Sequence, residues 1–160
     1  MSTLTINNYT LEIFDLGAKD KMNKYLKLIN VDLSDYTFAG NYIWLSTATG
    51  FYTIVNDTFC LFILNSGTLT MLLPPIGKKE NTYEAMIKCF EIMNEHNSNR
   101  NYSKIEYVHE ELLEGFVDYL EEGTLVYEML KDFIVEKKLV DYIYKVEDLI
   151  DLKGDSYKSK

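Results

Sequence analysis

The sequence is poor in residues that cross-link a chain or bind metals. Its 160 residues include only two cysteines and two histidines. Cys60 and Cys89 lie inside apolar segments, where free cysteines behave as small hydrophobic residues, so we expect both to be reduced and buried. Two cysteines are too few for the disulfide framework of a small secreted domain. No pair of Cys or His residues has zinc-ligand spacing, so no metal site is expected.

Positive charge is also scarce. Sixteen basic residues face 25 acidic ones, which gives a net charge of −9. Nucleic acids and anionic membranes both require a basic surface, so we expect this chain alone to bind neither tRNA nor anionic vesicles. The sequence has no apolar run of membrane-spanning length and no signal-peptide pattern, which predicts a cytoplasmic location without membrane insertion.

The sequence does contain the material for one folded domain. Apolar residues make up 47% of the chain and aromatic residues 14%, which excludes a disordered protein. The pattern predicts a strand over 9–14, a helix over 18–29 and a short helix over 36–45. Three strands follow at 51–55, 59–64 and 68–73. Turn residues at Asn56-Asp57 and Asn65-Ser66-Gly67 predict an antiparallel meander.

The stretch 68–93 is predicted to form a strand, a loop and a helix in that order. Pro74 and Pro75 end its strand because they lack backbone donors. We expect a helix to begin at Asn81 as the N-cap, with Glu84 completing a capping box, and to end near His96. A loop between a strand end and a helix N-terminus suits an anion or a small ligand.

The second half of the sequence predicts further strands and helices. A strand around Ile105 and Tyr107 would lie parallel to strand 68–73 after a β-α-β crossover. The next segment, 110–122, predicts an amphipathic helix whose acids form a solvated face. Its apolar stripe comprises Leu112, Leu113, Phe116, Val117 and Leu120. Two strands over 125–135 and 139–146 and a helical start over 147–152 complete a mixed α/β (α+β) sheet protein.

This order of elements resembles the GNAT superfamily of N-acyltransferases, in which an antiparallel meander precedes a parallel crossover. Three motifs resemble a largely uncharacterised bacterial family related to the C-terminal domain of phosphatidylglycerol lysyltransferases. They are Asp32-Leu33-Ser34-Asp35-Tyr36-Thr37-Phe38-Ala39 with Tyr42-Ile43-Trp44, Leu73-Pro74-Pro75-Ile76-Gly77, and Asp141-Tyr142-Ile143-Tyr144 with Val146-Glu147-Asp148-Leu149, followed by Leu152-Lys153-Gly154 and Tyr157.

The resemblance implies a tandem of two GNAT-like domains, of which this chain resembles the first. Residues 1–146 would form that domain, and residues 147–160 would be the start of the connector to a missing second domain. In that architecture the second half carries the substrate chemistry of aminoacyl transfer from tRNA to a lipid head group. No catalytic residue can therefore be transferred to this sequence, and its catalytic residues stay unknown.

The candidate cofactor-binding residues are Gly77, Lys78 and Lys79, in the loop before the third helix. An acyl-CoA-binding loop needs several glycines whose N–H groups can approach the pyrophosphate, and this loop has one glycine and two prolines. The sequence therefore predicts no cofactor, with acyl-CoA as the alternative. His109, between a strand and the acidic helix, is a candidate base, although a lone histidine without a Cys or Ser partner in its sequence context is weak evidence for catalysis.

Three functions remain open. The leading hypothesis is a non-catalytic first half of an acyl- or aminoacyl-transferase architecture that pairs with a second GNAT-like domain or another copy of itself. The second is a free-standing acyl-CoA-dependent N-acyltransferase with a degenerate cofactor loop, and the third is a small-ligand module beside residues 74–79. We also expect a homodimer through the last strands and the apolar segment 146–152. The apolar side chains of this segment would lie near a free end with no following chain to cover them, and exposed apolar patches favour association.

Overall fold

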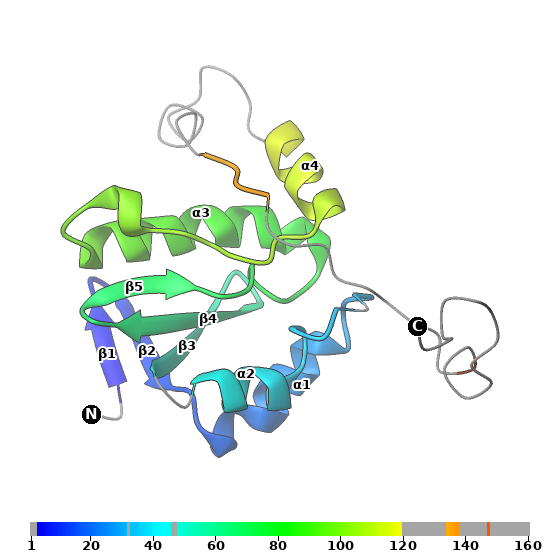
Figure 1. Cartoon of the computed structure of the whole chain (residues 1–160), viewed down its shortest axis with the longest axis horizontal. Coiled ribbons are helices and arrows are strands. Elements are labelled where there is room, and N and C mark those ends of the chain that lie inside the picture. Colours follow the sequence, from blue (N-terminus) through cyan, green and yellow to red (C-terminus); the bar gives the residue numbers. More distant parts are fainter. Residues whose placement is uncertain (1–2, 32, 46–47, 120–133, 138–146, 148–160) are drawn as a thin grey trace, which may run out of the picture.

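The computed structural model describes residues 3–31, 33–45, 48–119, 134–137 and 147. Its centre is a five-stranded antiparallel sheet in which each strand pairs with the next along the chain (Figure 1). The strands are β1 (Thr3–Ile6), β2 (Tyr9–Ile13), β3 (Thr49–Val55), β4 (Thr58–Asn65) and β5 (Thr68–Met71). The expected meander is confirmed, and the described residues form a mixed α/β fold.

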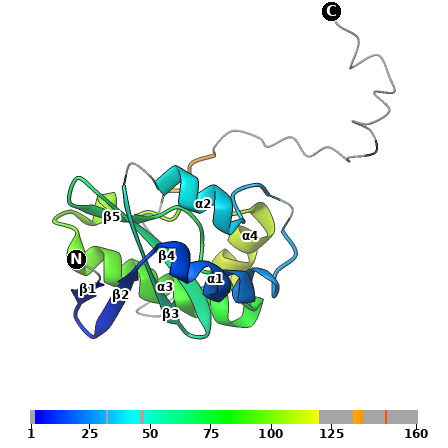
Figure 2. The same ribbon diagram turned by 90° about the horizontal axis from the view of Figure 1, so that it is seen from below.

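Helices cover both faces of the sheet. On one face lie η1 (Leu16–Ala18), α1 (Lys19–Leu26) and α2 (Phe38–Trp44). The other face carries α3 (Lys79–His96) and α4 (Glu110–Tyr119), with η3 (Arg100–Tyr102) between them in the chain. The view from below shows α1 and α2 together on their side of the sheet (Figure 2). The expected helices at these positions are confirmed.

Strand β4 contributes to two hydrophobic cores at once. Cys60 and Phe62 point toward α3, whereas Phe59 and Leu61 point toward α1 and α2, and all four side chains are almost fully buried. An alternating strand presents successive side chains to opposite faces, so a strand covered on both faces must be continuously apolar. The apolar run at 59–64 therefore matches the position of β4 between the two cores.

The hairpin turns are formed by residues that tolerate a left-handed backbone. Asn56 and Asp57 have φ values of 47° and 52°, and Ser66 and Gly67 have values of 50° and 82°. Two such residues in a row form the tight turn that matches the twist of paired strands. Between β1 and β2, Asn7 has a φ of 51°. Strand β1, which has four residues, was not predicted from the sequence.

The predicted strand at 105–107 is not present as a strand. A single parallel bridge joins Met71 and Ile105 there. The Met71 amide donates to the Lys104 carbonyl at 2.9 Å, and the Glu106 amide donates to the Met71 carbonyl at 2.9 Å. Tyr107, with φ of 48°, turns the chain immediately afterwards, which is why the pairing does not continue.

Helix α4 buries less of its predicted stripe than expected. Leu112 and Phe116 are buried against α3, but Val117 is 58% exposed. Among the later predictions, only residues 134–137 and Glu147 are described. Ile134 and Val135 are exposed and not in a strand. The remainder of the predicted strands 125–135 and 139–146, Leu120, and the association segment 146–152 apart from Glu147 lie outside the described residues.

The side chain of Asn97 forms hydrogen bonds with β5 of the kind that a neighbouring strand would form. Its Oδ1 accepts from the Leu69 amide at 2.8 Å, and its Nδ2 donates to the Leu69 carbonyl at 2.9 Å. Nδ2 also donates to the Ser103 hydroxyl at 3.0 Å. Asn97 is only 8% exposed, so the amide satisfies backbone groups that water does not reach.

We predict that Asn97→Ala lowers the free energy of unfolding by about 2–3 kcal/mol, because it leaves buried donors and acceptors of Leu69 and Ser103 without partners. Ser98→Ala, at the exposed neighbouring position, is the matched control and should change stability by less than about 0.5 kcal/mol. Urea unfolding followed by circular dichroism measures both. Equal stability of the two variants would show that the Asn97 amide is dispensable.

Candidate functional site

The loop between β5 and α3 is fixed to strand β4. Ile76 and Phe59 exchange two backbone hydrogen bonds, with Ile76 N–H donating at 2.9 Å and Phe59 N–H donating at 2.8 Å. Pro74 and Pro75, which precede the bridge, are buried and have no backbone donor. The loop is therefore joined to β4 by a single antiparallel bridge, and its Ile76 amide is already hydrogen-bonded.

Gly77 has a packing role in this loop. A Cβ atom at this position would lie 2.8 Å from the Thr58 Cγ2 atom and 3.1 Å from the Asp57 carbonyl oxygen. Glycine is therefore required because the loop passes close to the β3–β4 turn. Among the described glycines only Gly67 has a positive φ, so Gly77 is not needed for a left-handed backbone.

Helix α3 begins earlier than predicted. Lys78, not Asn81, is the N-cap, and no side chain caps the helix there. Asn81 lies inside the first turn, and its amide donates to the Lys78 carbonyl at 3.0 Å. The capping box is therefore wrong. Glu84 instead accepts a hydrogen bond of 3.2 Å from the Asn56 side chain, which ties α3 to the β3–β4 turn.

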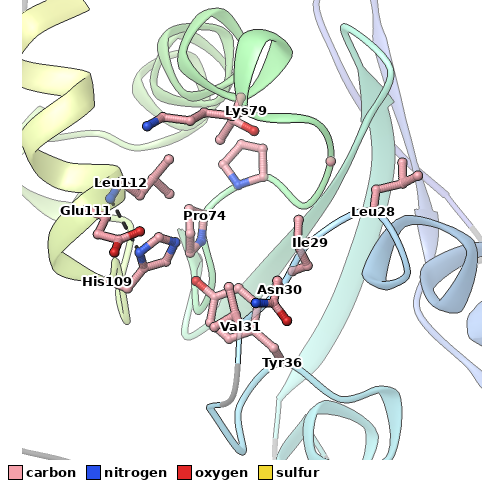
Figure 3. A pocket seen from close by; sticks show the side chains of 13 residues that line it. Leu28, Ile29, Asn30, Val31, Tyr36, Pro74, Lys79, His109, Glu111 and Leu112 are labelled. Atoms are coloured by element: carbon pink, nitrogen blue, oxygen red, sulfur yellow. Dashed lines mark hydrogen bonds between the residues drawn. The ribbon is translucent and has the colours of Figure 1, made fainter.

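A cavity of about 220 Å³ opens where this loop meets the segment after α1 and the start of α4 (Figure 3). Its apolar walls are Leu28, Ile29, Val31, Pro74, Pro75 and Leu112, and Gly77 also borders it. Polar side chains on its lining are Asn30, Tyr36, Lys79, Thr82, His109 and Glu111. An apolar cavity with a few polar groups around it is the usual form of a small-molecule site.

The predicted loop residues take different positions at this cavity. Lys79 extends from the start of α3 toward α4, so its stem forms part of the wall (Figure 3). Gly77 is buried and contributes backbone. Lys78 is exposed and does not line the cavity. Gly77 and Lys79 therefore line the cavity and Lys78 does not, and cofactor binding by these residues stays a prediction.

His109 lies at the start of α4 with its ring toward Pro74 (Figure 3). Its Nδ1 accepts a long hydrogen bond of 3.4 Å from the Leu112 amide, so the imidazole acts as the N-terminal cap of α4. The ring also stands edge-on to Tyr36, whose hydroxyl donates to the Tyr107 carbonyl at 3.2 Å. These contacts join the segment before α2 to the segment before α4.

The environment of His109 keeps its imidazole neutral. Partial burial lowers its pKa below the usual 6.5; Glu111 opposes this shift, and Lys79 adds to it. In the neutral ring, the accepting Nδ1 leaves the proton on Nε2. In this form, Nε2 of His109 can donate a hydrogen bond. The catalytic role considered for His109 stays a prediction.

Other residues named from the sequence lie elsewhere. His96 ends α3, and its Nε2 lies 3.2 Å from the Gly67 carbonyl oxygen. It does not line the cavity. Cys60 and Cys89 are free and buried, and burial raises the pKa of the Cys89 thiol, which makes it unreactive. The paired tyrosines Tyr142 and Tyr144 lie outside the described residues.

The His, Cys, Asp and Glu side chains of the described residues include no group of three that could hold a metal ion. Across the same residues, no helix has the length and apolarity needed to cross a lipid bilayer.

Comparison with known proteins identifies the family. Residues 26–160 match the family model described as phosphatidylglycerol lysyltransferase, C-terminal. The chain belongs to this family. All segments that line the cavity lie within the matched range, so the cavity is formed by the family region. The search of curated proteins and the search of solved structures found no match. The lysyltransferase family relationship supports an acyl- or aminoacyl-transferase-related domain.

We predict that His109 makes stability depend on pH between neutrality and mild acid. The folded lysyltransferase-family domain holds the imidazole neutral, whereas the unfolded chain takes up a proton near pH 6.5. The free energy of unfolding should therefore fall as the pH drops below 6.5 and level off below the lowered pKa. Glu12, whose pKa is lowered by the Tyr52 hydroxyl, titrates below 4.5 and stays ionised in this window.

His109→Asn is the variant that isolates this effect, because asparagine also caps helices but does not titrate. Urea unfolding at pH 7.5 and 5.5 should show a smaller loss of stability in the variant than in the wild type. His96→Asn, which alters the other histidine, is the control and should retain the wild-type loss. An unchanged pH dependence in His109→Asn would contradict the interpretation.

Proposed function

We propose that this chain is a GNAT-like, non-catalytic first half of an acyl- or aminoacyl-transferase architecture and that it acts by pairing with a second domain of that kind. The observation that carries the proposal is the β5–α3 loop. In acyl-CoA-dependent enzymes of the GNAT type, the corresponding loop offers backbone N–H groups to the cofactor pyrophosphate.

Three residues of this loop offer no free N–H group to a pyrophosphate. Pro74 and Pro75 have no N–H, and the Ile76 N–H is bonded to Phe59. The glycine that a phosphate loop would use, Gly77, is held close to the β3–β4 turn by packing. The loop therefore has a structural role. These features favour a non-catalytic first half of a transferase over the alternative of a free-standing acyltransferase.

Two measurements test the proposal. Calorimetry with acetyl-CoA should give no binding heat for the wild type or for a Lys78→Ala/Lys79→Ala variant. Sedimentation velocity should show a one-to-one complex when the chain is mixed with the separately produced second transferase domain of a phosphatidylglycerol lysyltransferase. Micromolar binding of acetyl-CoA that is lost in the lysine variant would favour the free-standing enzyme, and failure to form the complex would contradict pairing.

The cavity supports a second candidate function, a site for a small ligand. Its walls are apolar, while Lys79 supplies a positive charge and Glu111 a negative one, and the neutral His109 can donate a hydrogen bond. A volume of about 220 Å³ is smaller than most drug-sized sites, which suits a ligand the size of an amino acid. The two opposite charges could pair with the carboxylate and ammonium groups of an amino acid, while the apolar wall contacts its side chain.

The family description names a lysyl group, so free L-lysine is the appropriate probe. We predict that millimolar L-lysine shifts the His109 ring signals in NMR spectra of the wild type. Lys79→Ala should weaken the shift several-fold, and Lys78→Ala, at the exposed neighbouring position, should not. Absence of a lysine-dependent shift in the wild type would remove amino acids from consideration.

A further inference from the structure

The cavity beside the β5–α3 loop has a charged end and an apolar end. Lys79 and Glu111 are the only charged side chains among the described residues that line it. Both lie on the side of α4, where the His109 ring also lies, and these three residues form the charged end (Figure 3). Leu28 lies on the opposite side, in the segment that follows α1, with Pro74 between the two ends.

The charged end offers groups of both signs to a ligand. Glu111 and Lys79 are near enough to His109 to shift its pKa in opposite directions, Glu111 upward and Lys79 downward. Within the described part of the chain, neither of the two forms an ion pair. The neutral imidazole adds an N–H donor at Nε2. A ligand carboxylate can therefore bind to Lys79 and His109, and a ligand ammonium can bind to Glu111.

The two hydroxyl groups of the cavity lining are already used as donors. The Tyr36 hydroxyl donates to the Tyr107 carbonyl at 3.2 Å, and the Thr82 hydroxyl donates to the Lys78 carbonyl at 3.0 Å. A ligand carboxylate is thus directed to the charged end rather than to these hydroxyl groups.

The apolar end consists of Leu28, Ile29 and Val31. Ile29 and Val31 pack against the hydrophobic core beneath α1 and α2, which holds this segment in place. Among the described lining residues of this segment only Asn30 is polar, and none is charged. An ammonium group placed there would lose hydration without gaining an opposite charge, whereas a hydrocarbon chain would gain apolar contacts.

We propose that the cavity binds an α-amino acid with an uncharged, apolar side chain in preference to lysine. Its α-carboxylate and α-ammonium groups bind at the charged end, and its side chain lies against the apolar end. The proposal rests on the second candidate function, a small-ligand site, and deepens it by naming the class of ligand.

Titration of the His109 ring signals in NMR spectra at pH 7.5 measures this preference, with L-norleucine and L-lysine as probes. The two amino acids have the same straight side chain, except that lysine carries an ammonium group at its end. We expect the dissociation constant of L-norleucine to be at least about five-fold lower than that of L-lysine, because only lysine places a charge at the apolar end.

Hexanoate tests the charged end, because it equals L-norleucine without the α-ammonium group. It should bind at least about five-fold more weakly than L-norleucine, since it leaves Glu111 without a partner. Glu111→Gln should weaken L-norleucine several-fold and leave hexanoate unchanged. Glu110→Gln is the matched control, because Glu110 is the exposed preceding residue of α4 and does not line the cavity.

A carboxylate added at the apolar end should reverse the preference. Leu28→Glu supplies a partner for the side-chain ammonium of lysine, so L-lysine should bind this variant more tightly than L-norleucine does. Leu16→Glu is the control, since Leu16 is also exposed but does not line the cavity, and it should keep the wild-type preference. Both positions are exposed, so thermal unfolding should confirm that the variants fold.

The possible failures can be told apart. L-lysine binding as tightly as L-norleucine to the wild type would overturn the preference and leave the small-ligand site intact. Equal binding of hexanoate and L-norleucine, with no effect of Glu111→Gln, would overturn the amino-acid class in favour of a simple carboxylate. If none of the three probes shifts the His109 signals, the small-ligand site itself is wrong, and this inference fails with it.

Discussion

The pair of hydrogen bonds between Ile76 and Phe59 determines much of what lies around it. Phe59 belongs to the strand that both cores share, so the bridge attaches the loop to a strand that is buried on both faces. From there the chain can reach α3 only by passing the β3–β4 turn, and only a glycine at position 77 fits. The path of the loop thus determines where α3 begins, and the first turn of α3 forms one wall of the cavity.

The cavity is formed by segments that are distant in sequence. The segment after α1, the loop before α3 and the start of α4 each supply a wall. Tyr36 and His109 join two of these segments, through the hydrogen bond of Tyr36 to Tyr107 and the contact between the two rings. His109 also caps α4, so the residue that adjusts the polarity of the cavity also stabilises the helix beside it.

Local patterns predicted much of the fold, whereas non-local contacts decided the site. The meander was predicted because Asn56, Asp57 and Gly67 have turn chemistry that does not depend on distant residues. The start of α3 was misplaced because a residue with good capping chemistry, Asn81, follows a loop whose course is set by strand β4. Asn30 and Glu111 gave no sequence signal for the cavity, since only folding brings them to it.

The side-chain amide of Asn97 has a consequence for how molecules of this protein meet. It occupies the Leu69 hydrogen-bonding positions that a strand from another chain would use, and the bridge to Ile105 occupies those of Met71. The β5 border of the sheet is thus closed to added strands, as in proteins that avoid edge-to-edge aggregation. At the opposite border of the described sheet, the terminal strand is β1, which has four residues.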